Sequence, residues 1–175
     1  MTDKLGIQEH VMDTSQGLFG RLYQWRCRPY IHRMLAKEIS VFSRYFDRTI
    51  QLEPRKDDSS GLLSFVDCAQ KSVAPKQQDL PTISSAEDRT LILLNGNLNH
   101  HFDVQQLLKN TKTHMNRHSR VCAVVYSSYL RWLYALANSL RIRSGELPST
   151  FFTQRDLKNL CEIAGFSIVR AKSGH

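Results

Sequence analysis

The chain has 175 residues, of which 41% are hydrophobic and 23% charged, and its formal net charge is +8. The length suits one globular domain with a sizeable core, and the apolar and charged fractions are those of an ordinary soluble globular protein. No apolar run approaches the roughly 18–20 residues of a membrane-spanning helix, and the first residues lack the basic head and apolar block of a secretory signal. We therefore expect a cytoplasmic protein without a membrane span.

The cysteines are spread widely along the sequence, at Cys27, Cys68, Cys122 and Cys161. They form no close Cys-x-x-Cys pair, so neither zinc-ligand spacing nor a small disulfide framework is present. We expect reduced thiols in the core and no metal site.

The positive charge is concentrated towards the C-terminus. Between residues 112 and 172 there are ten Lys and Arg against three acidic residues, Glu146, Asp156 and Glu162. A basic surface attracts nucleic acid, phosphorylated ligands or anionic lipid, but a solvated helical face has the same composition. No zinc finger, RNA-recognition aromatic signature or helix-turn-helix spacing accompanies the charge.

In the first half of the chain, apolar residues between Leu18 and Phe42 recur in three- and four-residue steps. This spacing predicts two helices that meet near Pro29, a residue suited to a first helical turn. Together they form an N-terminal helical extension, residues 1–45, ahead of an α/β domain over residues 46–175.

The middle of the chain has weaker signals. Residues 49–52 form a strand candidate that Glu53 and Pro54 end, and a polar turn follows at residues 55–61. Residues 62–73 fit one face of a helix, but residues 63–67 also fit a short strand. Residues 74–88 indicate a long loop with room for one short strand at residues 82–83.

The second half alternates apolar runs with helical patterns. Strands are expected at residues 90–94, 121–126 and 166–170, and helices at residues 102–115, 129–140 and 153–164. Buried strands alternating with helices predict a mostly parallel sheet covered on both faces. Ligands bind such sheets beyond the carboxyl ends of the strands, which makes residues 95–97, Asn-Gly-Asn, a candidate binding edge.

The end signals of the last helix are complete. Thr153 can cap its first turn, Asp156 complements the helix dipole, and Gly165 can adopt the left-handed closing conformation.

Several short segments carry a resemblance to a known family. Leu-Asn-His-His-Phe-Asp at residues 98–103 resembles the Leu-Glu-His-x-x-Asp segment after strand four of class I S-adenosylmethionine-dependent methyltransferases. Ser-Arg-Val at residues 119–121 resembles the lead into the family's fifth strand. Ala-Gly-Phe at residues 164–166 resembles the end of its late helix. Residues 126–132 and 151–157 are similar to the methyltransferase domains of bifunctional glycosyltransferase/methyltransferases, as is the helical region 23–33.

The resemblance implies a Rossmann-like α/β fold and S-adenosylmethionine as cofactor, with a small molecule or glycan precursor as methyl acceptor. It implies His100 as a general base, and six cofactor-binding residues: Glu53, Gly61, Asp67, Asn95, Gly96 and Asn97. The sequence leaves no room for a seventh strand after residue 170, so we expect an incomplete sheet. Its open edge would favour a homodimer.

Each of these residues also has a purely structural interpretation. A histidine at a helix start bonds local backbone, and asparagines after a strand form turns without any ligand. Glu53 lies beside Arg55 and Lys56, with which it could pair, and Asp67 could be an exposed helical acid.

Other side chains near these segments have similar alternatives. Trp25, Tyr129 and Trp132 are expected in the core or between helices rather than as a substrate platform. The arginines at positions 26, 28 and 33 could contact an anionic acceptor or lie on a solvated helix face.

The sequence departs from the family at the cofactor loop. A Gly-x-Gly-x-Gly motif should follow Glu53, but residues 54–61 contain only Gly61. Glycines let the backbone approach the cofactor closely, whereas Pro54 lacks an N–H donor and Lys56 places positive charge near a sulfonium. The missing glycines motivate one alternative, a catalytically inactive methyltransferase-fold remnant that serves as an interaction module. The basic C-terminal third motivates another, a basic nucleic-acid-binding protein.

Overall fold

A computed structural model describes residues 27–54, 61–83, 88–128, 131–139 and 148–172. Within these ranges the regular elements follow in this order: α2 (Arg28–Ser43), β1 (Arg48–Leu52), α3 (Leu62–Phe65), β2 (Gln70–Ala74), the 3₁₀ turn η2 (Gln77–Asp79), β3 (Thr90–Asn95), α4 (Asn97–His100), α5 (Val104–Thr113), β4 (Arg120–Val124), α6 (Arg131–Ser139) and α7 (Gln154–Ile163).

The strands form one parallel sheet in the order β2-β1-β3-β4, so β2 and β4 are its outer strands. From β1 the chain moves outward to β2, and it then crosses back over β1 to reach β3 and β4. The direction of winding therefore reverses between β1 and β3. This is the predicted α/β, Rossmann-like architecture, with four strands among the described residues and none that would correspond to a seventh.

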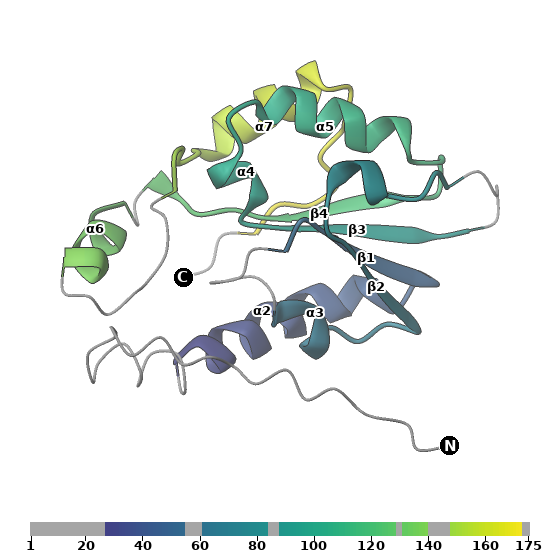
Figure 1. The fold of residues 1–175 in the computed structure, drawn as a ribbon, viewed down its shortest axis with the longest axis horizontal. Coiled ribbons are helices and arrows are strands. Elements are labelled where there is room, and N and C mark those ends of the chain that lie inside the picture. The colour runs from purple at the N-terminus through teal and green to yellow at the C-terminus, as the bar shows by residue number, and fades with distance from the viewer. Residues whose placement is uncertain (1–26, 55–60, 84–87, 129–130, 140–147, 173–175) are drawn as a thin grey trace, which may run out of the picture.

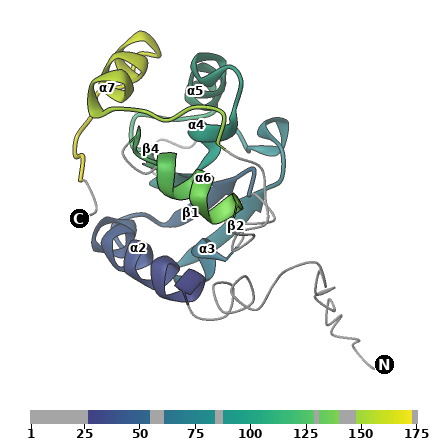
Figure 2. The ribbon, with the colours of Figure 1, turned by 90° about the vertical axis from the view of Figure 1, so that its left-hand side faces the viewer.

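Helices cover both faces of the sheet (Figure 1), and Figure 2 shows the same two layers from the side, with α2 and α3 opposite α5 and α7. Side chains alternate along β3 because neighbouring residues of a strand point to opposite faces. Leu91 and Leu93 pack in the core beneath α2 and α3, whereas Ile92 and Leu94 pack in the core beneath α5 and α7. All six residues of β3 are buried, as expected for a central parallel strand.

Three predicted strands lie close to where the sequence placed them, as β1, β3 and β4. The last predicted helix is α7, in which Thr153 Oγ1 accepts from the Asp156 N–H in a reciprocal capping box. Gly165 has φ +76, as its predicted role requires. The predicted helix over residues 102–115 is α5, preceded by the separate single turn α4.

Other predictions were wrong. Residues 62–73 are neither one helix nor a strand at 63–67, because α3 ends at Phe65 and the strand β2 begins at Gln70. The sequence missed β2 because most of this outer strand is exposed and polar. Residues 82–83 form no strand; instead the Ile83 N–H donates to the carbonyl of His114 at 2.9 Å.

The segment after Gly165 is also not a strand. Residues 166–170 join no ladder among the described residues, and Val169 is 84% exposed. Phe166 packs against the core beneath α7, which fixes the start of the segment without a strand partner. Two side chains expected in the core are exposed as well, Trp132 on α6 and Cys27 before α2.

The described part of the N-terminal extension contributes to the core. Ala36 and Ile39 of α2 pack in one cluster with Leu62, Leu91 and Leu93, so the described half of the extension is a layer of the α/β domain. Pro29 lies in the first turn of α2, as predicted. The predicted boundary at residue 45 stays a prediction, and the first predicted helix lies outside the described residues.

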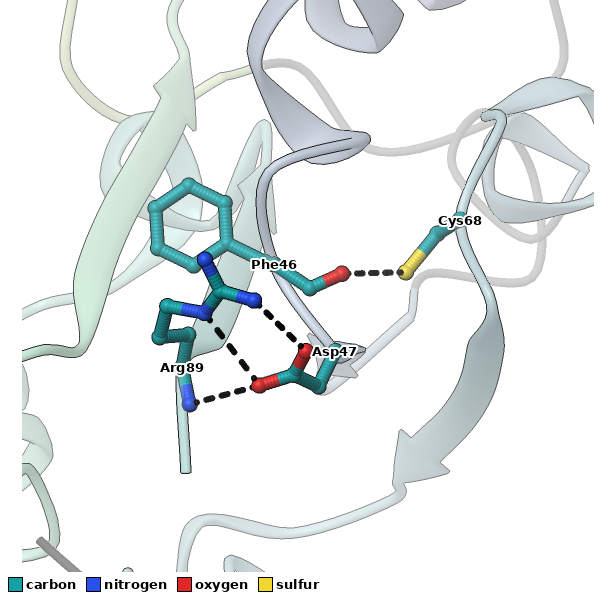
Figure 3. A network of polar contacts seen from close by, with 4 residues as sticks. All are labelled: Phe46, Asp47, Cys68 and Arg89. Carbon is teal, nitrogen blue, oxygen red and sulfur yellow. Dashed lines mark hydrogen bonds and ion pairs between the residues drawn. The ribbon is translucent and has the colours of Figure 1, made fainter. Parts of the chain in front are cut away.

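A charged pair joins β1 to β3 at the amino edge of the sheet (Figure 3). Arg89 donates through Nε and its backbone N–H to Asp47 Oδ2 and through Nη2 to Oδ1, at 3.1–3.4 Å. In return the Asp47 N–H donates to the Arg89 carbonyl at 2.8 Å. The Arg89 hydrogen bonds hold the pKa of Asp47 below its usual value.

This pair predicts a contribution to acid sensitivity. Because the folded pKa of Asp47 lies below the unfolded value of about 3.9, its stabilisation is complete above that pH and is lost as pH falls through the folded pKa. We expect Asp47→Asn to reduce the fall in Tm between pH 6 and pH 3. The reduction should be small, because both side chains are more than half exposed. An unchanged Tm profile would show that the pair makes no pH-dependent contribution.

The buried central strand predicts a large stability effect. Leu94 is 0% exposed, so Leu94→Ala should lower the free energy of unfolding by about 2–5 kcal/mol in urea titrations. The matched control is Val169→Ala, which should change it by less than about 0.5 kcal/mol because this side chain is exposed. Equal effects of the two substitutions would contradict the placement of β3 at the centre of the sheet.

Candidate functional site

The candidate site lies at the carboxyl ends of β1 and β3, where the winding of the sheet reverses. In open parallel sheets the chain leaves such neighbouring strands in opposite directions, and ligands bind in the crevice between them. Glu53 directly follows β1, and Asn95 is the last residue of β3. Gly96 has φ +75 and turns the chain into α4, which carries Asn97 and His100. The structure therefore brings together five of the seven predicted site residues at this edge.

Asn97 connects the ends of the two strands. Its Nδ2 donates to the backbone carbonyls of Leu52 and Glu53, each at 3.0 Å. The side chain is buried, and its Oδ1 has no hydrogen-bond partner in the structure. A buried acceptor without a donor is rare in folded proteins and is commonly completed by water or a ligand. Asn97 thus fixes the switch point and keeps one buried acceptor there without a partner.

Glu53 lies in a conformation that favours glycine. Its φ of +43 makes it the single described non-glycine residue with positive φ. Such backbone costs on the order of 1 kcal/mol and persists where surrounding contacts impose it. Those contacts are visible here: the Glu53 N–H donates to the Ala74 carbonyl at 2.7 Å, and Glu53 Oε1 accepts from the Gln77 N–H at 3.1 Å. The carboxylate therefore ties the end of β1 to the segment after β2.

Asn99 was not predicted as a site residue but is the most heavily bonded side chain at this edge. Its Nδ2 donates to the carbonyls of Tyr126 and Thr150 at 3.1 and 2.7 Å, and its Oδ1 accepts from the Tyr126 N–H at 2.7 Å. It is completely buried. Asn99 therefore anchors α4 to the end of β4 and to the segment before α7. The sequence feature that could have identified Asn99 as a site residue is its position in the polar run after β3.

His100, the predicted general base, lies at the end of α4 and is half-buried. Its ring stands edge-on to that of Tyr126, with 6.4 Å between centroids. Tyr126 also limits the space at the preceding turn, because a Cβ on Gly96 would lie 3.1 Å from the Tyr126 hydroxyl. The positive φ and this close approach together explain why glycine occupies position 96.

Two predicted residues are not brought to the switch point. Asp67 precedes β2 and so lies at the amino edge of the sheet, where its backbone bonds the hydroxyls of Ser40 and Ser43. Gly61 begins α3 and lies against His32 of α2, with an ordinary φ of −95°. The prediction placed Asp67 after a strand, but the strand begins three residues later. Within the predicted cofactor loop, residues 54–61, residues 55–60 lie outside the described part of the chain.

The reactive side chains of the described ranges do not add a second site. Burial raises the pKa of the Cys122 thiol to about 12, so it stays protonated at neutral pH and is a poor nucleophile. The four cysteines are free thiols. Among the described residues no group of His, Cys, Asp and Glu is arranged to hold a metal ion.

Comparisons with known proteins add no family to this description. No protein-family model matches the sequence, and no curated protein matches it significantly. In the ranges that the structure describes, no helix is long and apolar enough to cross a bilayer.

The described residues fit one end of S-adenosylmethionine better than the other. Polar groups at the switch point, Glu53 and Asn97 above all, suit the charged amino-acid end of the cofactor. The ribose end normally meets an acid after the second strand. Here β2 is followed by Pro75 and Lys76, and the next acid, Asp79, accepts from the Lys76 N–H in a local turn. The fit is therefore partial.

The bonds of Asn97 predict a structural effect. Asn97→Ala removes the donors to two strand-end carbonyls, so it should lower the free energy of unfolding by about 1–3 kcal/mol in urea titrations. Asn110→Ala is the matched control, because Asn110 makes only a long contact to Gln77, at 3.4 Å, and an exposed bond to Gln106. If Asn97→Ala is no more destabilising than the control, Asn97 does not hold the switch point together.

Proposed function

We propose that the chain is a methyltransferase-type domain that binds S-adenosylmethionine at the switch point between β1 and β3. The observation that carries the proposal is the convergence of Glu53, Asn95, Gly96 and Asn97 at the carboxyl ends of these strands, with a buried, unused acceptor on Asn97. The parallel sheet and the segments that resemble the family support it.

Each residue has a distinct role in this proposal. Asn97 Oδ1 would accept a hydrogen bond from the ammonium group of the ligand, and the Glu53 carboxylate would provide a second, charged partner for it. Gly96, through its positive φ, turns the chain so that Asn97 and His100 follow at the edge of the site. When bound, S-adenosylmethionine supplies an activated methyl group, so the protein has mainly to position the acceptor and exclude water. His100 would take a proton from a hydroxyl or amine of a small-molecule or glycan acceptor.

A second candidate is a methyltransferase-like fold that no longer binds the cofactor and serves as an interaction module. A specific observation favours it. Both N–H donors of the Asn97 amide and one oxygen of the Glu53 carboxylate already bond the protein itself. The switch point is therefore partly closed by its own side chains, and the ribose end lacks its acid. Under this candidate the fold persists and the cofactor site does not.

Calorimetric titration of the purified protein with S-adenosylmethionine and with S-adenosylhomocysteine separates the two candidates. We expect saturable heat with both ligands, weaker than a complete site would give because the ribose end is poorly matched. Glu53→Gln should reduce the affinity, since the amide keeps an acceptor for the Gln77 N–H but loses the charge that faces the ammonium.

The control is Asp79→Asn, which neutralises a nearby acid that bonds its own turn. It should leave the affinity unchanged. Absence of heat with folded protein at millimolar ligand would contradict cofactor binding and favour the interaction module. Equal losses in Glu53→Gln and Asp79→Asn would show that net charge, rather than the switch point, governs binding.

A further inference from the structure

The outward face of α2 exposes a row of apolar side chains. Tyr30, Met34 and Val41 are 68%, 49% and 44% exposed, and Tyr45, just past the end of the helix, is 60% exposed. They follow one another at four- and seven-residue steps, which places them on the same side of a helix. The buried residues of α2, among them Ala36 and Ile39, lie on the opposite side and face the sheet. The exposed row is therefore a second apolar surface, separate from the core.

Positive charges lie along this row. Lys37 and Arg44 are exposed and flank the row on the outward side of the helix, and the exposed Arg33 lies about a quarter turn away, towards α3. Glu38 is the one acidic residue of α2, and its carboxylate is paired with Lys172 Nζ at 2.7 Å. The carboxylate that would offset these cations is thus neutralised by a lysine from the C-terminal segment. The face combines apolar area with net positive charge.

Aromatic rings hold two of the cations in place. The Arg44 guanidinium lies 5.1 Å from the centroid of the Tyr45 ring, and its Nη2 donates to the Tyr45 hydroxyl at 3.2 Å. The Arg33 guanidinium lies 5.6 Å from the ring of Phe65, which is itself 39% exposed on α3. In Figures 1 and 2, α2 forms the outer layer of its side of the sheet, so this face points away from the core.

We propose that the outward face of α2 binds the surface of an anionic lipid bilayer. Basic amphipathic helices bind such surfaces by inserting apolar side chains at the headgroup boundary while Lys and Arg meet the lipid phosphates. Tyrosines are favoured at that boundary, and this row has one at each end, Tyr30 and Tyr45. Charge complementarity selects anionic over neutral lipid. Nucleic acid fits less well, because the aliphatic Met34 and Val41 at the centre provide no ring on which bases stack.

Co-sedimentation of the full chain with vesicles tests the proposal. Vesicles of phosphatidylcholine alone are compared with vesicles that also contain phosphatidylserine, at low and at physiological salt. We expect binding to the phosphatidylserine vesicles only, weakening as salt rises. Lys37→Gln should lower the partition coefficient about fivefold, the effect of one cation near such a surface. Val41→Asp should lower it further, because it removes apolar contact and adds a negative charge.

Matched controls lie on α7, where Lys158 and Ile163 are also exposed. Lys158→Gln and Ile163→Asp make the same chemical changes and should leave vesicle binding unchanged. Thermal unfolding of every variant confirms that the fold is retained, since all four side chains are exposed.

Three outcomes would overturn the proposal: equal binding to neutral vesicles, equal losses in the α2 and α7 variants, and no vesicle binding with salt-sensitive binding to a single-stranded oligonucleotide instead. The last would assign the same face to nucleic acid. None of these outcomes depends on whether S-adenosylmethionine binds at the carboxyl edge of the sheet.

Discussion

The carboxyl edge of the sheet depends on one amide group. The two hydrogen bonds from Asn97 to the carbonyls of Leu52 and Glu53 join the ends of β1 and β3, the two strands that the chain leaves in different directions. Unpaired carbonyls at the end of a buried strand are costly, so the amide satisfies a need that the topology itself creates. The left-handed backbone of Glu53 and the turn at Gly96 can be understood as consequences of this connection. The Oδ1 atom of the same amide is buried without a partner.

Three side chains secure this edge, and each one contacts a different part of the sheet. Glu53 reaches towards β2, Asn97 links β1 with β3, and Asn99 holds the end of β4. All four strands are thereby connected beyond their backbone ladders. These bonds tie the carboxyl edge together although α3, in the first crossover, is a single turn. Side chains held in place by such bonds suit a binding site at a switch point.

Apolar periodicity predicted the central strands and the helices beside them, because burial on both faces leaves an unmistakable hydrophobic run. It failed for β2, whose polar residues lie at the margin of the sheet, and for residues 166–170, whose strand-like pattern found no partner. For the site, the sequence located Glu53 and Asn97 at strand ends, but it could not reveal that Asn97 bonds the Glu53 carbonyl or that Asp67 lies on the other edge. Those facts depend on register and strand order, which local composition does not encode.

The two outer strands have a consequence for the behaviour of the chain in a crowded solution. An unpaired outer strand can add to that of another copy and start open-ended association. Here Lys71 and Arg120 are exposed on β2 and β4, so two copies approaching edge to edge would bring like charges together. Among the described residues β2 and β4 are the outer strands, and this repulsion works against edge-to-edge pairing of two copies.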